Sequence, residues 1–321
     1  MIRVQNLTKN FGPKTAVNNV TFSVERGEVL GFLGPNGAGK STTMRMVTGF
    51  IPPTAGGVQI GEFNMLEQPI DAKKLLGYLP ENAPLYGDMT VYGFLGFAAE
   101  MRGLRGEEKK HAVHRVVEMC FLEGVLHQSI DTLSKGYRHR TCFAQAILHD
   151  PPILIMDEPT DGLDPNQKHE VRSLIRRMGE QKAIVFSTHI LEEVEAACSR
   201  AIIIDRGQIV ANGTPAELKQ RSELSGTIIV RVAGVPAAAL QQKLAQISGV
   251  GRAVALTSTG TAAAARVFPQ RRLTDGELAR AIHQTLAREG WTIEELHTDE
   301  GRLDEVFRDI TLPDTRKEVA S

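Results

Sequence analysis

The feature that most constrains this 321-residue chain is a glycine-rich stretch of the pattern GxxxxGK[ST], which reads Gly34-Pro35-Asn36-Gly37-Ala38-Gly39-Lys40-Ser41. An apolar, strand-like run over 29–33 precedes it, and a helical run over 41–48 follows. This order predicts a phosphate-binding loop, because glycines let successive N–H groups point at phosphate oxygens and the helix adds its positive end. In such a loop Lys40 reaches the β- and γ-phosphates, and Ser41 is a ligand for Mg²⁺.

Two further strand-like runs end in side chains suited to the same chemistry. The run 153–156 leads into Asp157 and Glu158, and the run 183–187 ends just before His189. Ligands in open α/β sheets bind at the carboxyl ends of the strands. We expect Asp157 to hold Mg²⁺ through its hydration shell and Glu158 to polarise the water that attacks the γ-phosphate. His189 is expected to contact that phosphate.

Charge and composition exclude several classes of protein. Lys and Arg number 37 against 38 Asp and Glu, a net charge of −1 that lacks the basic excess of a dedicated nucleic-acid binder. No apolar run approaches the roughly 18 to 20 residues of a membrane span, and the first residues do not form a leader. We therefore expect a cytoplasmic protein with no nucleic-acid partner. Cys120, Cys142 and Cys198, without CxxC spacing, are expected to be structural.

Strand-like and helical runs alternate from residue 2 to 209, which predicts an α/β sheet with helices packed on it. Between 84 and 150 the apolar residues recur at three- and four-residue steps, which indicates an inserted helical subdomain. An Arg-Gly pair at 206–207, between two β-prone runs, predicts a hairpin that ends this domain. The first domain is expected to span 1–221.

The composition changes near Ser222, where we place the domain boundary. Residues 222–312 are predicted to form strand, helix, strand, strand, helix, strand and a final short helix, an order that suggests an α+β, ferredoxin-like domain. The predicted runs are 227–232, 236–247, 253–257, 264–268, 274–288, 292–297 and 303–310. Residues 313–321 have no apolar face and are expected to form a flexible tail.

One more segment, Leu133-Ser134-Lys135-Gly136-Tyr137-Arg138, opens the last helical run before Asp157. With the phosphate loop upstream and with 159–164 and His189 downstream, this order resembles the ATP-binding cassette (ABC) ATPases, which are P-loop NTPases. In that family the segment is the signature motif, usually LSGGQ, and 159–164 is the D-loop. The resemblance covers residues 2 to about 218. The wording LSKGYRHR, with GYLPEN at 77–82 and LDEVF at 303–307, looks like the ATPase subunits of ABC-2-type exporters, and most like the subtype named for gliding motility.

The resemblance implies an ATPase subunit that energises a separate permease and lies, through it, at the cytoplasmic face of the membrane. It implies a RecA-like α/β core, an antiparallel β subdomain and the inserted helical subdomain. ATP and Mg²⁺ are the implied cofactors, held between two chains of a head-to-tail homodimer. Beyond the residues above, the motifs carry over Phe11 as the ring that stacks on adenine, and they add to the nucleotide site Val17, Thr42, Ser134, Lys135, Gly136 and Asp164.

Four positions depart from the commonest family pattern. Lys135 and Tyr137 replace a Gly and the Gln of the signature, as in the export subtype, and Phe11 stands where Tyr is more usual. At Glu81 the family usually has a Gln that touches Mg²⁺ and the attacking water, and a carboxylate can still ligate the metal. The aromatic-rich stretch 86–97 includes side chains that could line the groove where, by resemblance, a permease helix docks.

A second class of function stays open, a soluble ATP-dependent switch protein that acts on a non-membrane partner. Members of the superfamily with such roles carry long coiled coils or two cassettes in one chain. This sequence has neither heptads nor a second phosphate loop, which favours the exporter subunit. For the C-terminal domain two roles remain, stabilisation of a dimer or sensing of a small ligand.

Overall fold

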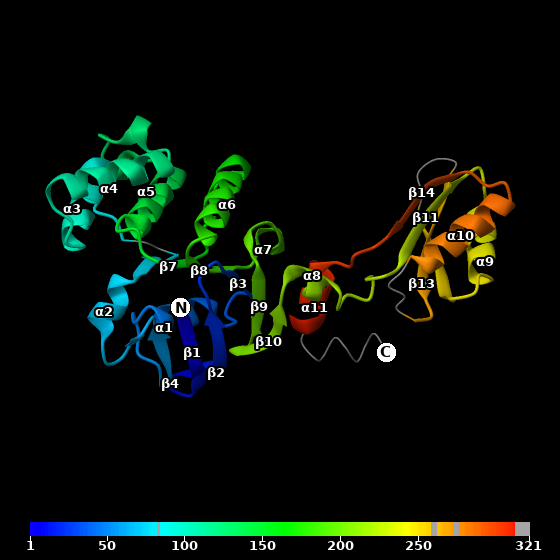
Figure 1. The fold of residues 1–321 in the computed structure, drawn as a ribbon, viewed down its shortest axis with the longest axis horizontal. Helices are drawn as coiled ribbons and strands as arrows, with labels where there is room; N and C mark the ends of the chain where they lie inside the picture. Colours follow the sequence, from blue (N-terminus) through cyan, green and yellow to red (C-terminus); the bar gives the residue numbers. More distant parts are fainter. Residues whose placement is uncertain (82–83, 258–261, 272–275, 312–321) are drawn as a thin grey trace. The chain divides into compact units, whose positions relative to one another are not determined.

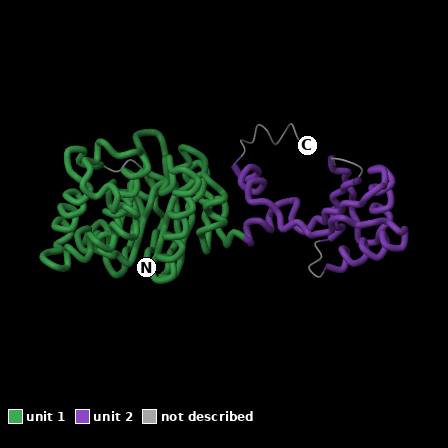
Figure 2. Tube along the Cα trace, turned by 90° about the horizontal axis from the view of Figure 1, so that it is seen from above, with its two compact units in different colours: residues 1–215 green, residues 216–321 purple. Residues whose placement is uncertain are grey.

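The computed structural model describes residues 1–81, 84–257, 262–271 and 276–311. Two compact units, Met1–Pro215 and Ala216–Ser321, make up the chain and are coloured separately in Figure 2. The predicted tail at 313–321, Asn82 of the GYLPEN phrase and the predicted helix start at Thr274 lie outside the described residues.

A six-stranded sheet forms the centre of the first unit, in the order β10-β9-β3-β8-β7-β6. Its strands are β3 (Val29–Leu33), β6 (Leu76–Leu79), β7 (Ile153–Asp157), β8 (Ala183–Thr188), β9 (Arg200–Asp205) and β10 (Gln208–Gly213). All neighbours pair in parallel except β9 and β10, which form the predicted hairpin. Strands β3, β7 and β8 are buried along their whole length, as expected for parallel strands covered on both faces. The carboxyl ends of β3, β6, β7 and β8 therefore lie along one edge.

A second, antiparallel sheet has the order β2-β1-β4-β5. Its strands are β1 (Ile2–Phe11), β2 (Lys14–Val24), β4 (Ala55–Ile60) and β5 (Phe63–Asn64), and the short helix α2 (Pro69–Lys74) follows. Buried and exposed residues alternate along β2, which is typical of a sheet with one solvated face. Helix α1 (Lys40–Val47) packs between the two sheets, because Met44 and Met46 are buried in one cluster with Ile2 and Phe32.

Helices lie on the other side of the six-stranded sheet (Figure 1). They are α3 (Val91–Met101), α4 (Gly106–Met119), α5 (Lys135–Ile147), α6 (Pro165–Gly179) and α7 (Leu191–Ala197). Helices α5, α6 and α7 contact strands of the sheet, and α3 and α4 pack on α5. Helices α3, α4 and α5 lie within the stretch 84–150 in which helical spacing indicated a subdomain. Leu95, Val116 and Phe143 share one buried cluster with Met156 and Phe186 of the sheet, so the inserted helices are packed onto the same core.

The second unit holds one antiparallel sheet with the order β12-β13-β11-β14. Its elements are α8 (Pro215–Lys219), β11 (Ile228–Ala233), α9 (Ala237–Ala245), β12 (Val250–Leu256), β13 (Ala262–Pro269), α10 (Glu277–Arg288), β14 (Ile293–Thr298) and α11 (Leu303–Thr311). Between β11 and β14 the elements follow the expected β-α-β-β-α-β order. Leu240 of α9 and Ile282 of α10 pack with Val230 in its core. The unit begins before Ser222, because the Ser222 hydroxyl donates to Glu305 of α11.

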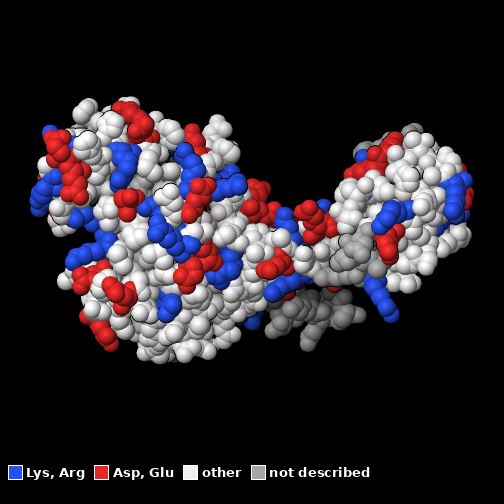
Figure 3. Space-filling model, in the orientation of Figure 1, with Lys and Arg blue, Asp and Glu red and all other residues white. Residues whose placement is uncertain are grey.

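Surface and thiol chemistry are unexceptional. Lysine and arginine are interspersed with aspartate and glutamate on the face shown in Figure 3. Cys120 and Cys142 are buried free thiols, and burial raises the pKa of each to about 12, which leaves them unreactive at neutral pH. Among the described residues, no helix is both long enough and apolar enough to cross a membrane.

Candidate functional site

The glycine-rich loop connects β3 to α1 as a tight cradle. Gly39 has φ +108°, and a Cβ added there would lie 2.7 Å from the carbonyl oxygen of Ala16, so only glycine fits this backbone. The side chain of Lys40 turns back over the loop, where Nζ donates to the carbonyl oxygens of Gly34 at 2.8 Å and Pro35 at 3.3 Å. A cation only 6% exposed is thereby held inside an anion-binding loop.

A cleft of about 440 Å³ opens over this loop, a volume in the usual range for a small-molecule site. It is lined by Phe11, Lys14, Ala16, Asn36, Gly37, Gly39, Lys40, Ser41, Thr42, Glu81 and Glu158. Phe11 stands at the end of β1 with its ring 51% exposed, so a π face is available to a base. Glu81 follows the end of β6, which places it with the loop as expected.

Several expected contact residues do not line the cleft themselves. Val17 is fully buried in the core cluster beneath the loop, and Gly34, Pro35 and Ala38 form the cradle behind it. Lys14 and Ala16, on the same strand as Val17, line the cleft instead. The sequence did not predict these two residues as part of the site, because they belong to no motif. Their only sequence signal is that they follow Phe11 closely.

Asp157 and Ser41 meet below the cleft. Asp157 is 1% exposed, and its Oδ1 accepts hydrogen bonds from the hydroxyls of Ser41, at 3.1 Å, and Ser187. Its Oδ2 is buried and has no hydrogen-bond partner among the described residues. A buried carboxylate oxygen left open beside a serine hydroxyl suits Mg²⁺, which binds through one or two carboxylates together with phosphate and water oxygens. The residues present therefore fit this ion.

Glu158 and His189 form a pair at the ends of β7 and β8. Glu158 Oε2 lies 3.0 Å from His189 Nδ1, and Oε1 lies 3.7 Å from Lys40 Nζ. Burial raises the pKa of Glu158, while the charges of His189 and Lys40 oppose the rise. Its backbone has φ +51°, uncommon for a non-glycine residue, and its N–H donates to the carbonyl and hydroxyl of Ser187. A more basic carboxylate is thus aimed at the cleft in a constrained backbone.

The signature residues lie around the N-terminus of α5. Ser134 caps α5 by accepting from the N–H of Tyr137 at 3.4 Å, and Gly136 packs against the side chain of Gln167. Lys135 Nζ lies 3.1 Å from Oδ2 of Asp161 in the D-loop. Asp164 caps α6 by accepting from the N–H of Gln167 at 2.9 Å. None of Ser134, Lys135, Gly136 and Asp164 lines the cleft of the same chain.

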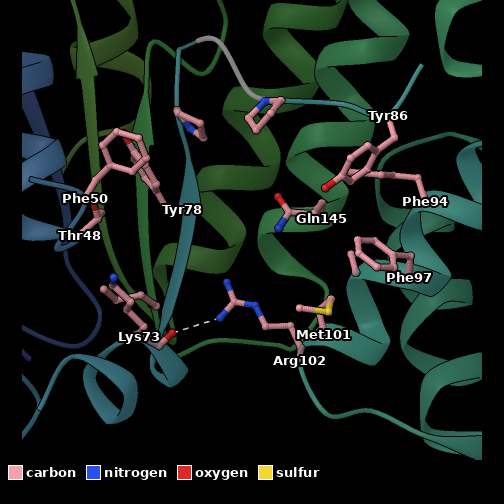
Figure 4. A pocket seen from close by; sticks show the side chains of 14 residues that line it. Thr48, Phe50, Lys73, Tyr78, Tyr86, Phe94, Phe97, Met101, Arg102 and Gln145 are labelled. Carbon is pink, nitrogen blue, oxygen red and sulfur yellow. Dashed lines mark hydrogen bonds between the residues drawn. The ribbon is translucent and has the colours of Figure 1, made fainter. Parts of the chain in front are cut away.

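A second hollow of about 530 Å³ lies between the core and the inserted helices (Figure 4). Phe97 and Met101 line it from α3, and Phe50 lines it from the opposite side. Arg102 bridges the two sides by donating to the carbonyl oxygen of Lys73 at 3.1 Å. The result is an apolar groove with two basic side chains at one end.

A phosphate loop, a carboxylate pair and a strand-end histidine, all at the ends of the parallel strands of one sheet, define a P-loop ATPase of the cassette type. Comparisons give its family: the model described as ABC transporter matches residues 17–161. The linearmycin resistance ATP-binding protein of Bacillus subtilis is 37% identical, over 72% of this chain and 74% of that protein. The Nod factor export ATP-binding protein of Burkholderia orbicola is 35% identical, over 76% and 80%.

A solved bacterial ABC transporter cassette, described as dimeric, superimposes with a TM-score of 0.63 at 25% identity, covering 67% of this chain and 99% of the cassette. The chain therefore belongs to the ABC transporter family, and its first unit is an ATP-binding and ATP-hydrolysing cassette. Cassettes of this family act with a transmembrane permease.

Proposed function

We propose that this chain is the ATPase subunit of an ABC-2-type exporter, that it works as a homodimer, and that it drives a separate permease from the cytoplasmic face of the membrane. One observation carries the proposal. Glu158 lines the nucleotide cleft and has His189 at 3.0 Å, whereas the signature residue Ser134 does not line the cleft of its own chain. A complete site therefore needs the signature surface of a second copy.

The reaction converts ATP and water into ADP and phosphate. Lys40 would bind the β- and γ-phosphates, and Ser41 and Asp157 would hold Mg²⁺, with Glu81 near its water shell. Bound Mg²⁺ supplies charge neutralisation on the β- and γ-phosphate oxygens. Glu158 would orient the attacking water and accept its proton, and positioning and electrostatics supply most of the catalysis.

Head-to-tail pairing would place the N-terminus of α5 of one copy over the γ-phosphate held by the other. That helix spans 13 residues, and its first-turn N–H groups and dipole favour an anion. The Gly136 N–H and the Lys135 ammonium would face the same phosphate. Two identical chains then close two equal sites, an isologous arrangement.

The groove in Figure 4 is the proposed contact with the permease. Phe97 is 39% exposed, Phe50 71% and Met101 73%, an unusual gathering of large apolar side chains on a surface. An amphipathic permease helix fits such a groove, with an acidic residue near Lys73 and Arg102. Relatives named for linearmycin resistance and Nod factor export support an export role. The ABC-2 permease type and the gliding-motility subtype stay predictions.

A matched pair of variants on α3 tests the permease contact. Phe97→Glu places a charge in the groove, whereas Tyr92→Glu places the same charge at a residue of the same helix that is 47% exposed and does not line the groove. We expect Phe97→Glu to abolish copurification with the membrane permease while purified-protein ATP turnover persists. Equal capture of both variants, or copurification of the chain with ribosomes or DNA in place of a permease, would contradict the proposal.

A further inference from the structure

A buried carboxylate outside the proposed mechanism connects the two strand ends that carry the hydrolytic pair. Glu193 lies in the first turn of α7 and is 1% exposed. Its Oε1 accepts from the hydroxyl of Thr160, and its Oε2 accepts from the hydroxyl of Thr188 at 2.7 Å. Both threonines are buried as well. One side chain thus bridges residues 28 positions apart in the sequence, which follow β7 and end β8.

At one end, the bridge holds the backbone around His189. Thr188 immediately precedes it, and the Thr188 hydroxyl also accepts the N–H of Ile190 at 3.0 Å. The Thr188 hydroxyl thus donates its one proton to Glu193 and accepts the Ile190 N–H through an oxygen lone pair. The peptide units on both sides of His189 are therefore tied to Glu193.

At the other end, the bridge holds the turn that contains Glu158. Thr160 is two residues beyond Glu158, and the N–H of Asp161 donates to the carbonyl oxygen of Glu158 at 3.1 Å. A positive φ at a glutamate costs about 1 to 3 kcal/mol and persists only where the surroundings over-determine it. Ser187 constrains this turn through the Glu158 N–H, and Glu193 constrains it from the side of Thr160.

Burial of a carboxylate destabilises the folded state by several kcal/mol unless its oxygens are well hydrogen-bonded, so a purely structural contact would not require this side chain. Nor does Glu193 form a capping box at the start of α7, because the N–H of the N-cap residue Ile190 donates to the Thr188 hydroxyl and not to the Glu193 carboxylate. What the two oxygens achieve is a fixed spacing between the turn after β7 and the end of β8. Across that spacing Glu158 and His189 lie 3.0 Å apart.

We propose that Glu193 is a positioning residue for ATP hydrolysis, which holds Glu158 and His189 in register by bonding Thr160 and Thr188. This inference rests on the proposed roles of Glu158 and His189. Glu193 itself does not line the cleft, so it acts through these two residues and not on the nucleotide.

Isosteric pairs of variants test the proposal. Thr188→Val and Thr160→Val keep the volume but remove the hydroxyl, whereas Thr188→Ser and Thr160→Ser keep the hydroxyl. The turnover number kcat should fall about ten- to a hundredfold in each Val variant, as for a misplaced catalytic group. The ATP dissociation constant should change less than twofold, and the Ser variants should retain kcat within about threefold. A Thr188→Val enzyme as active as Thr188→Ser, or one in which ATP affinity falls as much as kcat, would overturn the proposal.

A double-mutant cycle gives a second, independent measurement. Glu193→Gln leaves a single amide oxygen to accept from two hydroxyls, and so it loosens the same link as Thr188→Val. The losses in kcat of the two changes should not multiply in the double variant, because the link is lost only once. Fully multiplicative losses would refute the bridge. The two proposals fail in different ways. A wild-type chain that does not hydrolyse ATP would refute the proposed function, whereas an active wild type with multiplicative losses would refute only the positioning role of Glu193.

Discussion

Replacing Glu158 by Gln separates the chemistry of this side chain from its geometry. The amide keeps an oxygen that can accept from Nδ1 of His189, 3.0 Å away, and it keeps the volume of a side chain that is 13% exposed. What is lost is the negative charge and the ability to take a proton from water. The substitution therefore measures general-base catalysis with little change in the position of the neighbours.

The expected loss follows from that role. General-base catalysis contributes about 10²- to 10⁴-fold, or about 3 to 5 kcal/mol of the activation barrier. ATP binding should persist or tighten, because Lys40, 3.7 Å from Glu158, loses an anionic competitor of the phosphate. ATP that binds without turnover should also hold two copies together.

Steady-state phosphate release gives kcat, and mass measurement with Mg²⁺ and ATP gives the oligomeric state. Glu192→Gln is the matched control, because it removes the same charge from an exposed carboxylate just after the end of β8. We expect an ATP-dependent dimer of Glu158→Gln and a monomer without nucleotide. Turnover of Glu158→Gln within threefold of wild type, or a species that stays monomeric with ATP even beside its permease, would refute the reasoning.

Three further outcomes follow from the site and its surroundings. Glu158→Asn should abolish hydrolysis, and it should raise the unfolding free energy of the nucleotide-free protein by about 1 kcal/mol because Asn adopts a positive φ more readily than Glu. Urea unfolding without Mg²⁺ measures this free energy, and a variant less stable than wild type would contradict the expectation. Asp161→Asn releases Lys135 from an exposed ion pair, so it should change the unfolding free energy by less than about 1 kcal/mol. In the Glu158→Gln background, Asp161→Asn should strengthen ATP-dependent dimerisation, whereas Lys135→Ala should weaken this dimerisation. Sedimentation that shows the reverse order would count against a contact between Lys135 and phosphate. Burial lowers the pKa of His139 to about 4, so between pH 6.5 and 4 the unfolded chain binds a proton that the folded chain does not, and the unfolding free energy falls by up to about 3 kcal/mol as the pH is lowered. Denaturant titrations of His139→Gln across this range should show a flatter dependence of the unfolding free energy on pH. An unchanged dependence would exclude His139 as its source.

The nucleotide loop and the strand-end carboxylates could be read from sequence because their geometry is local. In 34–41 the glycines, the lysine and the start of α1 are contiguous, so the pattern itself specifies a backbone that curls around phosphate. Asp157 follows an apolar run whose burial fixes where the strand ends. The second unit was predictable in element order, since alternation and turn residues mark its strands, but its start at residue 216 was not.

Contacts between different strand ends depend on which strands are neighbours in the sheet, and the sequence motifs do not specify the strand order. Because β8 pairs with β7 in parallel, Ser187 comes to lie beside Asp157 and His189 beside Glu158. The Glu193 bridge depends on that same pairing, together with the packing of α7 on the sheet.

The sequence by itself determined the chemistry of the site, because each motif carries its side chains at fixed short spacing. Only the tertiary structure decided that Ser134 and its neighbours do not line the cleft of their own chain, while Lys14 and Ala16 do. The physical reason is that residue spacing determines in which direction side chains point within one helix, strand or turn. The distance between side chains on different elements is determined by the packing of the whole core.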